Sequence, residues 1–429
     1  MKKANIAVLV VIALPICGFF RSTITFAAVE IPDIQDVLDK AEAGPDLIGG
    51  VYDKSFSIYV ADTERYDTNL FRLPNGTNVA TLVGPNAAKQ DLITSPSGGL
   101  DGQWGIGRQV VNFAFNVQDN RFSNNSNLNN VATTDKVGWN WGIGDVLTGE
   151  VGVQYLQALA GFVNATTFTR NIYSQTNYFA AGRYQLGPHW AVYGGVLESV
   201  FGLNQSTSKG NNSRSKSADM GVDFTTDVQT TFGLDYRYTD ARFPNAIALS
   251  QTTFDPDFRE DRVRFLYKQT LSEKTTLDVN AGFLKRNYAN SVIDSFSGPI
   301  WRASLGWQPT GKTQFIVATW RNLQAYLTDQ TNYYRSTGAS ISPQWSATDK
   351  ISVSLTVSRE DQSYIGTSPI ALNQSARKDT VNGQVANVSY IPTHSLSFNL
   401  SYHREQRSSN QPLRTYTDGL TSASVKFAF

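Results

Sequence analysis

Few side chains in this sequence have the types and spacing that catalysis or metal binding requires. The chain has three histidines, of which His189 and His394 fall in predicted turns. His403, in the run Ser401-Tyr402-His403-Arg404, lies in a predicted strand and is the one candidate for a catalytic base beside a serine. We interpret it as a polar side chain that faces the interior of a barrel. The sequence has no paired-histidine helix, cysteine cluster or Walker-type loop, so we expect no metal, no cofactor and no enzymatic activity.

Charged side chains recur instead at alternate positions of several segments. Val263, Phe265 and Tyr267 alternate with polar residues, and successive side chains of a strand point to opposite faces. If these apolar residues face lipid, their charged neighbours face inward. The predicted inward, pore-lining set comprises Arg237, Arg262, Arg264, Lys268, Arg286 and Arg302, with Asp223, Asp235 and Asp278 among them. These residues either line a path for solutes or form a ladder of salt bridges that fills the interior.

The same period of two dominates the chain from Val51 onward and predicts strands with one apolar and one polar face. Clear examples are the segments 113–117, 234–238, 277–283, 351–357 and 396–402. Alternation of this kind fits either an outer-membrane barrel or a large soluble sandwich, so the connections have to decide between the two.

The connections alternate between short and long. Eight short turns lie near 104–107, 144–145, 186–188, 226–227, 272–274, 309–312, 348–350 and 392–394. Nine longer polar loops lie near 62–89, 123–130, 165–170, 205–213, 244–258, 289–297, 328–332, 363–376 and 408–413. Bacterial outer-membrane barrels have short periplasmic turns, longer outer loops and an even number of strands. We therefore predict an all-β, antiparallel, up-and-down outer-membrane barrel of about 18 strands, with 16 as the alternative. The higher count depends on a strand near Asp91 to Trp104.

The first residues have the layout of a secretory signal peptide. Lys2 and Lys3 precede an apolar run from Ile6 to Phe20, and a small-residue site follows at Thr25-Phe26-Ala27. The apolar run is shorter than the roughly 20 residues of a membrane-spanning helix. The predicted organisation is a signal peptide over 1–27, a short periplasmic leader over 28–50, and the barrel over 51–429.

Composition agrees with an exported barrel. After residue 28 no apolar run approaches the length of a membrane-spanning helix, although 12% of the residues are aromatic. The single cysteine, Cys17, falls in the predicted signal peptide, so a hydrogen-bond ladder closed in lipid would have to supply the stability that disulfides give other exported proteins. The formal net charge of +1 gives no argument for binding nucleic acid.

The C-terminal segment alternates up to an aromatic last residue. Val425, Phe427 and Phe429 share one face, and such an apolar edge would promote aggregation in a soluble protein. A terminal aromatic residue on an alternating strand resembles the signal that the outer-membrane assembly machinery recognises, so Phe427 and Phe429 are the predicted assembly signal. Four tryptophans on predicted lipid faces are interpreted as residues of the membrane interface: Trp139, Trp141, Trp301 and Trp307.

The segment Arg65-Tyr66-Asp67-Thr68-Asn69-Leu70-Phe71-Arg72-Leu73-Pro74 resembles a run near the start of exopolysaccharide-associated outer-membrane proteins of the EpsL type, within the broader group of β-barrel porins. Gly107-Arg108-Gln109 and Trp139-Asn140-Trp141 are similar to later marks of that family, whereas Thr68 replaces its second aspartate. The resemblance implies an integral outer-membrane barrel that is encoded with a polysaccharide-assembly and exosortase system and serves secretion of the polymer.

The leading functional prediction is thus a channel or conduit that takes part in exopolysaccharide biosynthesis and export. Its expected partners are outer-membrane lipid, the outer-membrane assembly machinery, the secreted polysaccharide and a periplasmic export complex. The alternative is a general diffusion porin for small solutes, and an outer-membrane hydrolase is less favoured. Periodicity predicts the barrel, but it does not identify the cargo.

Overall fold

The computed structural model describes residues 54–429 except 164, 166, 247, 250–251, 254–255, 290–294, 329–330, 366–375 and 412. The predicted signal peptide and leader, and residues 51–53 of the predicted barrel, lie outside the described residues. Within the described part, no helix is long and apolar enough to cross a membrane.

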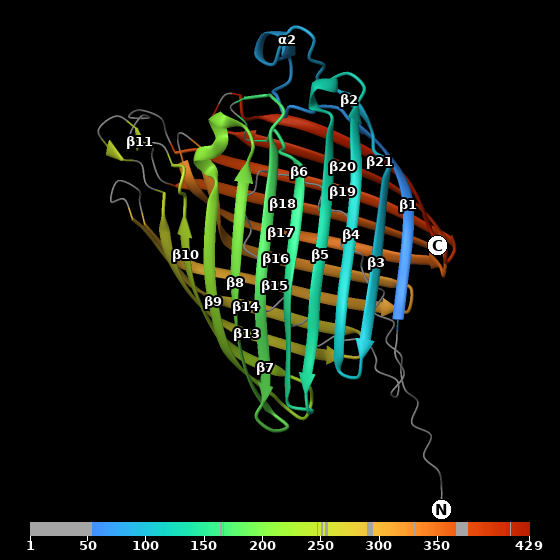
Figure 1. Cartoon of the computed structure of the whole chain (residues 1–429), viewed down its shortest axis with the longest axis vertical. Coiled ribbons are helices and arrows are strands. Elements are labelled where there is room, and N and C mark those ends of the chain that lie inside the picture. Colours follow the sequence, from blue (N-terminus) through green and yellow to red (C-terminus); the bar gives the residue numbers. More distant parts are fainter. Residues whose placement is uncertain are drawn as a thin grey trace, which may run out of the picture.

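Eighteen antiparallel strands close on themselves to form a barrel (Figure 1). The barrel strands are β1 (Lys54–Asp67), β3 (Ser97–Ile106), β4 (Gln109–Phe122), β5 (Asn130–Ile143), β6 (Leu147–Leu159), β7 (Ile172–Gln185), β8 (Trp190–Leu203), β9 (Ser213–Thr225), β10 (Thr231–Arg242), β13 (Phe258–Ser272), β14 (Thr275–Tyr288), β15 (Phe296–Thr310), β16 (Thr313–Thr328), β17 (Thr331–Thr348), β18 (Ile351–Ile365), β19 (Lys378–Thr393), β20 (Leu396–Ser409) and β21 (Tyr416–Ala428). Each strand pairs with its neighbours along the chain, and β1 pairs with β21 from Tyr59 opposite Ala428 to Asp67 opposite Leu420. This last pairing leaves no free sheet edge. The prediction of 18 strands is confirmed.

The predicted second strand is present but divided. β2 (Asp91–Thr94) pairs with β1 and β4, and β3 continues the same ladder after Ser95 and Pro96. Because proline has no backbone N–H, it cannot donate to the ladder at this point. The region near Asp91 to Trp104 therefore crosses the sheet in two pieces.

The connections have the predicted asymmetry. In Figure 1 the long connections gather at one end of the barrel and the short turns lie at the other. The long connections carry the remaining elements, which are α2 (Val79–Leu82), η1 (Ser126–Leu128), η2 (Ser206–Asn211) and the hairpin of β11 (Ala248–Leu249) and β12 (Thr252–Thr253). Three short turns of the described chain contain a glycine with positive φ, which are Gly107 with φ 61°, Gly144 with φ 60° and Gly187 with φ 125°. This asymmetry places the short turns in the periplasm and the long loops outside the cell.

Alternation between inner and outer faces follows the prediction. On β13, Val263 and Phe265 are 45% and 48% exposed, whereas Arg264 between them is 8% exposed. The outer face of the barrel is a belt of large apolar side chains, which in water would be an aggregation hazard and in lipid is the stable arrangement. The protein is an integral protein of the outer membrane.

Candidate functional site

The inner face of four adjacent strands, β9, β10, β13 and β14, brings most of the predicted charged residues together. Side chains directly opposite each other on one face of an antiparallel sheet are close enough to interact. The strand register forms three charged rows: Asp219–Arg237–Arg262, Asp235–Arg264 and Glu260–Arg286. We call these seven residues the charged ladder. The register thus places an acid directly opposite Arg237, Arg264 and Arg286, whereas Arg262 lies opposite Arg237.

Within each row, hydrogen bonds join an arginine guanidinium to a carboxylate. Arg237 Nε donates to Asp219 Oδ1 at 2.6 Å, and Arg262 Nη2 lies 3.9 Å from the same oxygen. Arg264 Nε donates to both carboxylate oxygens of Asp235, at 3.1 and 3.0 Å. In the third row, the guanidinium of Arg286 donates to Glu260 Oε2 at 2.8 Å.

The ladder is largely withdrawn from the interior solution. Arg237 is 3% exposed and Asp235 is 4% exposed. A buried ion pair loses several kcal/mol when one partner is removed, because the other charge is then left in a poorly solvated place. The ladder has the geometry of the salt-bridge alternative, and its contribution to the stability of the wall stays a prediction.

The other predicted residues also lie on the inner face but outside the ladder. Asp223 accepts a hydrogen bond at 2.7 Å from Arg183 of β7, a partner that the sequence analysis did not identify. Lys268 lies opposite Asp278, and Arg302 lies opposite Asn280. Lys268 and Arg302 are exposed, and in the described part of the chain no carboxylate lies within 4.0 Å of Arg302. All nine predicted side chains share the inner face, and their role in lining a pore stays a prediction.

A second cluster of buried charges lies near the outer mouth, and the sequence analysis missed it. Arg377 Nε donates to both oxygens of Asp379 at 3.0 Å, and Arg407 Nη1 donates to Asp379 at 3.3 Å. Arg377 also stacks over the ring of Tyr364, 4.1 Å from its centroid. Extending the alternation of Leu400 along β20 would have placed Arg407 on the inner face, but Asp379 becomes its partner only through the pairing of β19 with β20.

The segment that follows β1 joins the first strand to the last at the outer mouth. Arg72 Nη1 donates to both oxygens of Asp67 at 3.0 and 3.1 Å, and Arg72 Nη2 lies 3.1 Å from Asp418 Oδ2 on β21. The Thr68 N–H donates to the Gly419 carbonyl at 3.0 Å, and the Gly419 N–H donates to Thr68 Oγ1 at 2.8 Å. We call these five residues the mouth latch.

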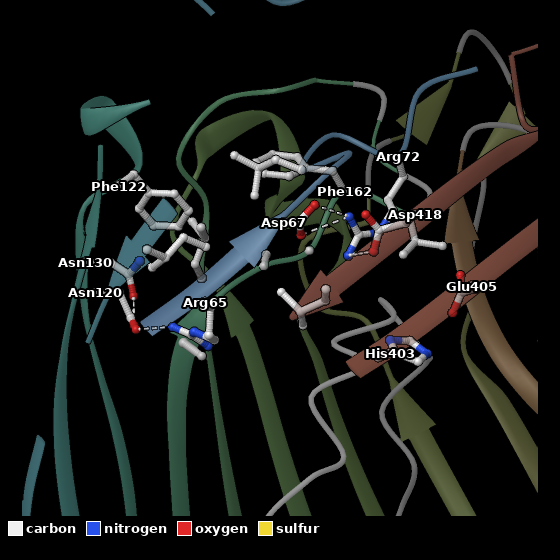
Figure 2. A pocket seen from close by; sticks show the side chains of 18 residues that line it. Arg65, Asp67, Arg72, Asn120, Phe122, Asn130, Phe162, His403, Glu405 and Asp418 are labelled. Atoms are coloured by element: carbon white, nitrogen blue, oxygen red, sulfur yellow. Dashed lines mark hydrogen bonds and ion pairs between the residues drawn. The ribbon is translucent and has the colours of Figure 1, made fainter. Parts of the chain in front are cut away.

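Figure 2 shows the guanidinium of Arg72 held between the two carboxylates of the latch. Arg72 adopts φ +56°, an uncommon conformation for a residue other than glycine, which these contacts maintain. Burial lowers the pKa of the Arg72 guanidinium, but the carboxylates of Asp67 and Asp418 outweigh burial and raise that pKa above its usual value. The side chain therefore stays charged.

Apolar residues of the same segment pack over the mouth. Phe71 packs against Phe162 with ring centroids 5.0 Å apart. The apolar cluster also contains Leu70, Leu73, Ile93, Phe122 and Leu128. Asn69 Nδ2 fixes the segment by donating to the carbonyls of Leu73 and Thr417, at 2.8 and 3.0 Å. The motif that carries the family resemblance thus forms the latch and this apolar cluster.

A cavity of about 140 Å³ lies beside the latch, between β1, the segment around Phe162 and the inner faces of β20 and β21 (Figure 2). Arg65 borders it and donates to Ser95 Oγ at 2.8 Å and Asn120 Oδ1 at 2.6 Å. His403 lies in the same wall, and no hydrogen bond joins it to a serine or an acidic side chain of the described chain. Over the described residues, no three His, Cys, Asp or Glu side chains are grouped so that they could hold a metal ion.

The two shorter segments of the family resemblance lie side by side at the periplasmic rim. Gln109 Nε2 donates to the Gly142 carbonyl at 3.0 Å, and Trp139 Nε1 donates to Gln109 Oε1 at 3.0 Å. Arg108 forms an ion pair with Asp145 in the next turn. These residues brace two adjacent periplasmic turns.

Aromatic residues on the outer face follow the periplasmic rim. Trp104, Trp139, Trp190, Trp307 and Trp345 lie near short turns and are 45–52% exposed. This is the expected place of an interfacial girdle. Trp301 differs, because Arg321 covers its ring at 5.4 Å.

The predicted assembly signal lies at the same rim. The rings of Phe427 and Phe429 are in edge contact, with centroids 4.8 Å apart, and both side chains are exposed. Their position on the closing strand agrees with the prediction, while recognition by the assembly machinery stays a prediction.

The chain is similar to several proteins that are described as porins. The family model described as "Putative beta-barrel porin 2" matches residues 267–429, which run from the end of β13 through β21. A BenF-like porin from Pseudomonas fluorescens Pf-5 is 11% identical with a TM-score of 0.48, over 89% of this chain and 100% of that chain. OccK2 (OpdF) from Pseudomonas aeruginosa, solved in complex with glucuronate, is 8% identical with a TM-score of 0.48, over 88% and 98%. The search of curated proteins found no match. Over residues 267–429 the closed barrel is therefore similar in sequence to a family of β-barrel porins.

Proposed function

We propose that this protein is a diffusion channel for small polar solutes, with a preference for anions. The observation that carries the proposal is the inner face of the closed barrel, where the exposed cations Lys268 and Arg302 lie on the same wall as the charged ladder. A polar inner face next to an apolar outer face is the arrangement of water-filled barrels, and 18 strands leave room for a channel.

The preference for anions rests on the exposed cations rather than on the ladder. The ladder has four arginines and three acids, and most of these charges are buried in pairs, so it contributes less to the field along the channel than exposed charges do. Lys268 and Arg302 are exposed on the inner face, where a charge acts directly on passing ions.

Planar-bilayer recordings of the purified protein test this proposal. The wild type should show stable channels with weak anion selectivity. Lys268→Glu combined with Arg302→Glu should shift the reversal potential toward cations while the barrel remains heat-modifiable. Arg121→Glu, a charge reversal at the exposed outer end of β4, is the control and should leave selectivity unchanged. A folded wild-type barrel without conductance, or a double variant with unchanged selectivity, would contradict the proposal.

Export of an exopolysaccharide stays a prediction of the family resemblance. The residues that carry this resemblance make contacts within the barrel, in the mouth latch and at the periplasmic rim. They therefore account for how the chain folds without reference to a polymer. Measuring secreted polymer in a clean deletion strain tests the export role separately.

A further inference from the structure

Arg65 of β1 differs from the buried arginines elsewhere on the inner face. Those side chains pair with an acidic partner, as shown by Arg183, Arg237, Arg264, Arg286, Arg377 and Arg407. Arg65 Nη2 instead donates to two neutral oxygens, Ser95 Oγ at 2.8 Å and Asn120 Oδ1 at 2.6 Å. Among the residues that the structure describes, no carboxylate forms an ion pair with Arg65, and its buried Nε has no acceptor. Because a cation withdrawn from water is costly without an anionic partner, this position favours an anion.

Hydrogen-bond donors outnumber acceptors around Arg65. Asn120 Oδ1 accepts not only from Arg65 but also from Ser95 Oγ at 2.9 Å and Gln118 Nε2 at 3.0 Å. A neutral amide oxygen has two lone pairs, whereas a carboxylate offers about four acceptor positions. Ser95 and Asn120 are 0% and 8% exposed, so the fold holds these groups in place. We call Arg65, Ser95, Gln118 and Asn120 the donor cluster.

The donor cluster borders the cavity beside the mouth latch through Arg65 and Asn120. Apolar side chains form much of the remaining wall, and these include Leu70, Ile93, Phe122, Phe162 and Leu420. The volume of about 140 Å³ is comparable with the roughly 150 Å³ of an engineered cavity in another protein that holds benzene. A ligand in this cavity can therefore place a small apolar body beside the guanidinium of Arg65.

The acidic side chains around the cavity have partners of their own. Figure 2 shows the side chain of Arg65 directed toward Asn120 and away from the mouth latch. Within the latch, the two carboxylates hold Arg72 between them. Glu405, on the wall formed by β20, accepts a hydrogen bond from the Tyr416 hydroxyl. The negative charge of the cavity is thus concentrated at the latch and on β20, whereas the part next to the donor cluster attracts an anion.

We propose that this cavity binds a small organic acid near the outer mouth of the barrel. Its carboxylate lies against the guanidinium of Arg65, where charge-assisted hydrogen bonds supply the missing acceptor. Its apolar body, about the size of benzene or smaller, lies against Phe122 and Phe162. The site is distinct from the exposed cations Lys268 and Arg302 on β13 and β15, so its binding can be measured whether or not the barrel conducts.

The test is isothermal titration calorimetry of the full-length barrel purified in detergent, with micelles alone as the blank. The probes are pentanoate, its neutral analogue pentanamide, and acetate, which has the charge but little apolar body. Pentanoate should bind at a single site. Pentanamide and acetate should bind at least roughly tenfold more weakly, because pentanamide cannot form charged hydrogen bonds and acetate buries less apolar surface.

Two variants act on the donor cluster in different ways. Arg65→Gln removes the cation and should weaken pentanoate binding by roughly tenfold or more. Asn120→Asp keeps the cation but gives it a carboxylate of the protein itself, so it should weaken binding to a similar extent. Arg121→Gln, which removes an exposed arginine of β4 outside the cavity, is the matched control and should bind pentanoate as the wild type does.

Heat-modifiability checks that each variant is folded, and Asn120→Asp carries the test if Arg65→Gln does not assemble. Equal binding of pentanoate by the wild type and an assembled variant of the donor cluster overturns the proposal. Equal binding of pentanoate and either of the other probes overturns it as well, as does a folded wild type that binds no pentanoate. Unchanged selectivity of the Lys268 and Arg302 variant in bilayers would contradict the proposed function alone and leave this binding unaffected.

Discussion

The wall of β9 to β14 and the outer mouth are both held together by buried ion pairs, but they are built in different ways. In the wall, most partners come from neighbouring strands, so Asp235 lies opposite Arg264 through the register of β10 and β13. At the mouth, Arg72 lies in an irregular segment near the beginning of the barrel and meets Asp418 of the last strand. The ion pairs of the wall follow from the alternation of side chains and the strand register. The ion pair at the mouth forms only when the whole sheet closes.

The largest expected effect tests the wall. Arg264→Gln should lower the free energy of unfolding by about 3 to 5 kcal/mol, because it leaves the carboxylate of Asp235 buried without its partner. Urea unfolding of the barrel in lipid vesicles measures this loss. Adding Asp235→Asn should recover part of it, since the unpaired charge is then gone. Arg121→Gln, at an exposed pair with Asp119, should change the free energy by less than about 1 kcal/mol. Equal effects of Arg264→Gln and Arg121→Gln would show that the ladder is not a structural feature.

The next effect tests whether the two faces of the wall differ as the alternation requires. Val279→Arg should cost about 2 to 4 kcal/mol if the side chain lies near the middle of the bilayer, whereas Asn280→Arg on the inner face should be tolerated. Leu355→Arg and Ser354→Arg form a second pair on β18, where Leu355 is 43% exposed on the outer face. The same vesicle unfolding measurement applies. Equal sensitivity within each pair would mean that the assignment of inner and outer faces is wrong.

The smallest effect tests the mouth. Arg72→Gln should lower the free energy of unfolding by about 1.5 to 3 kcal/mol, the range for hydrogen bonds to charged groups, because Asp67 and Asp418 lose their shared partner. Hydrogen exchange should rise at the outer ends of β1 and β21 and remain unchanged in β13 and β14. Arg170→Gln, which removes one exposed bond to the Asn129 carbonyl, serves as the control. Exchange that rises equally throughout the barrel would contradict a local latch.

Functional residues were predictable to the extent that they depend on local pattern. The nine charged residues of the predicted inward set lie on the inner face because side-chain direction follows directly from a period of two. Arg183, Arg377 and Arg407 were missed, although each occupies an inward position, because nothing in the local pattern distinguishes a buried arginine from an exposed one. The break between β2 and β3 was also missed, although Pro96 is its visible cause.

The sequence by itself predicted the alternation of the strand faces and which end of the barrel carries the long loops, and it narrowed the number of strands to 18 or 16. These features depend on residues that are close together in the chain, so period and turn composition are sufficient to predict them. Only the tertiary structure decided which charges meet. The strand register places Asp219 opposite Arg237, and closure of the sheet places Asp418 beside Arg72. The physical reason is that the energy of an ion pair depends on distance in space, and for residues far apart in the chain that distance is fixed only when the barrel closes.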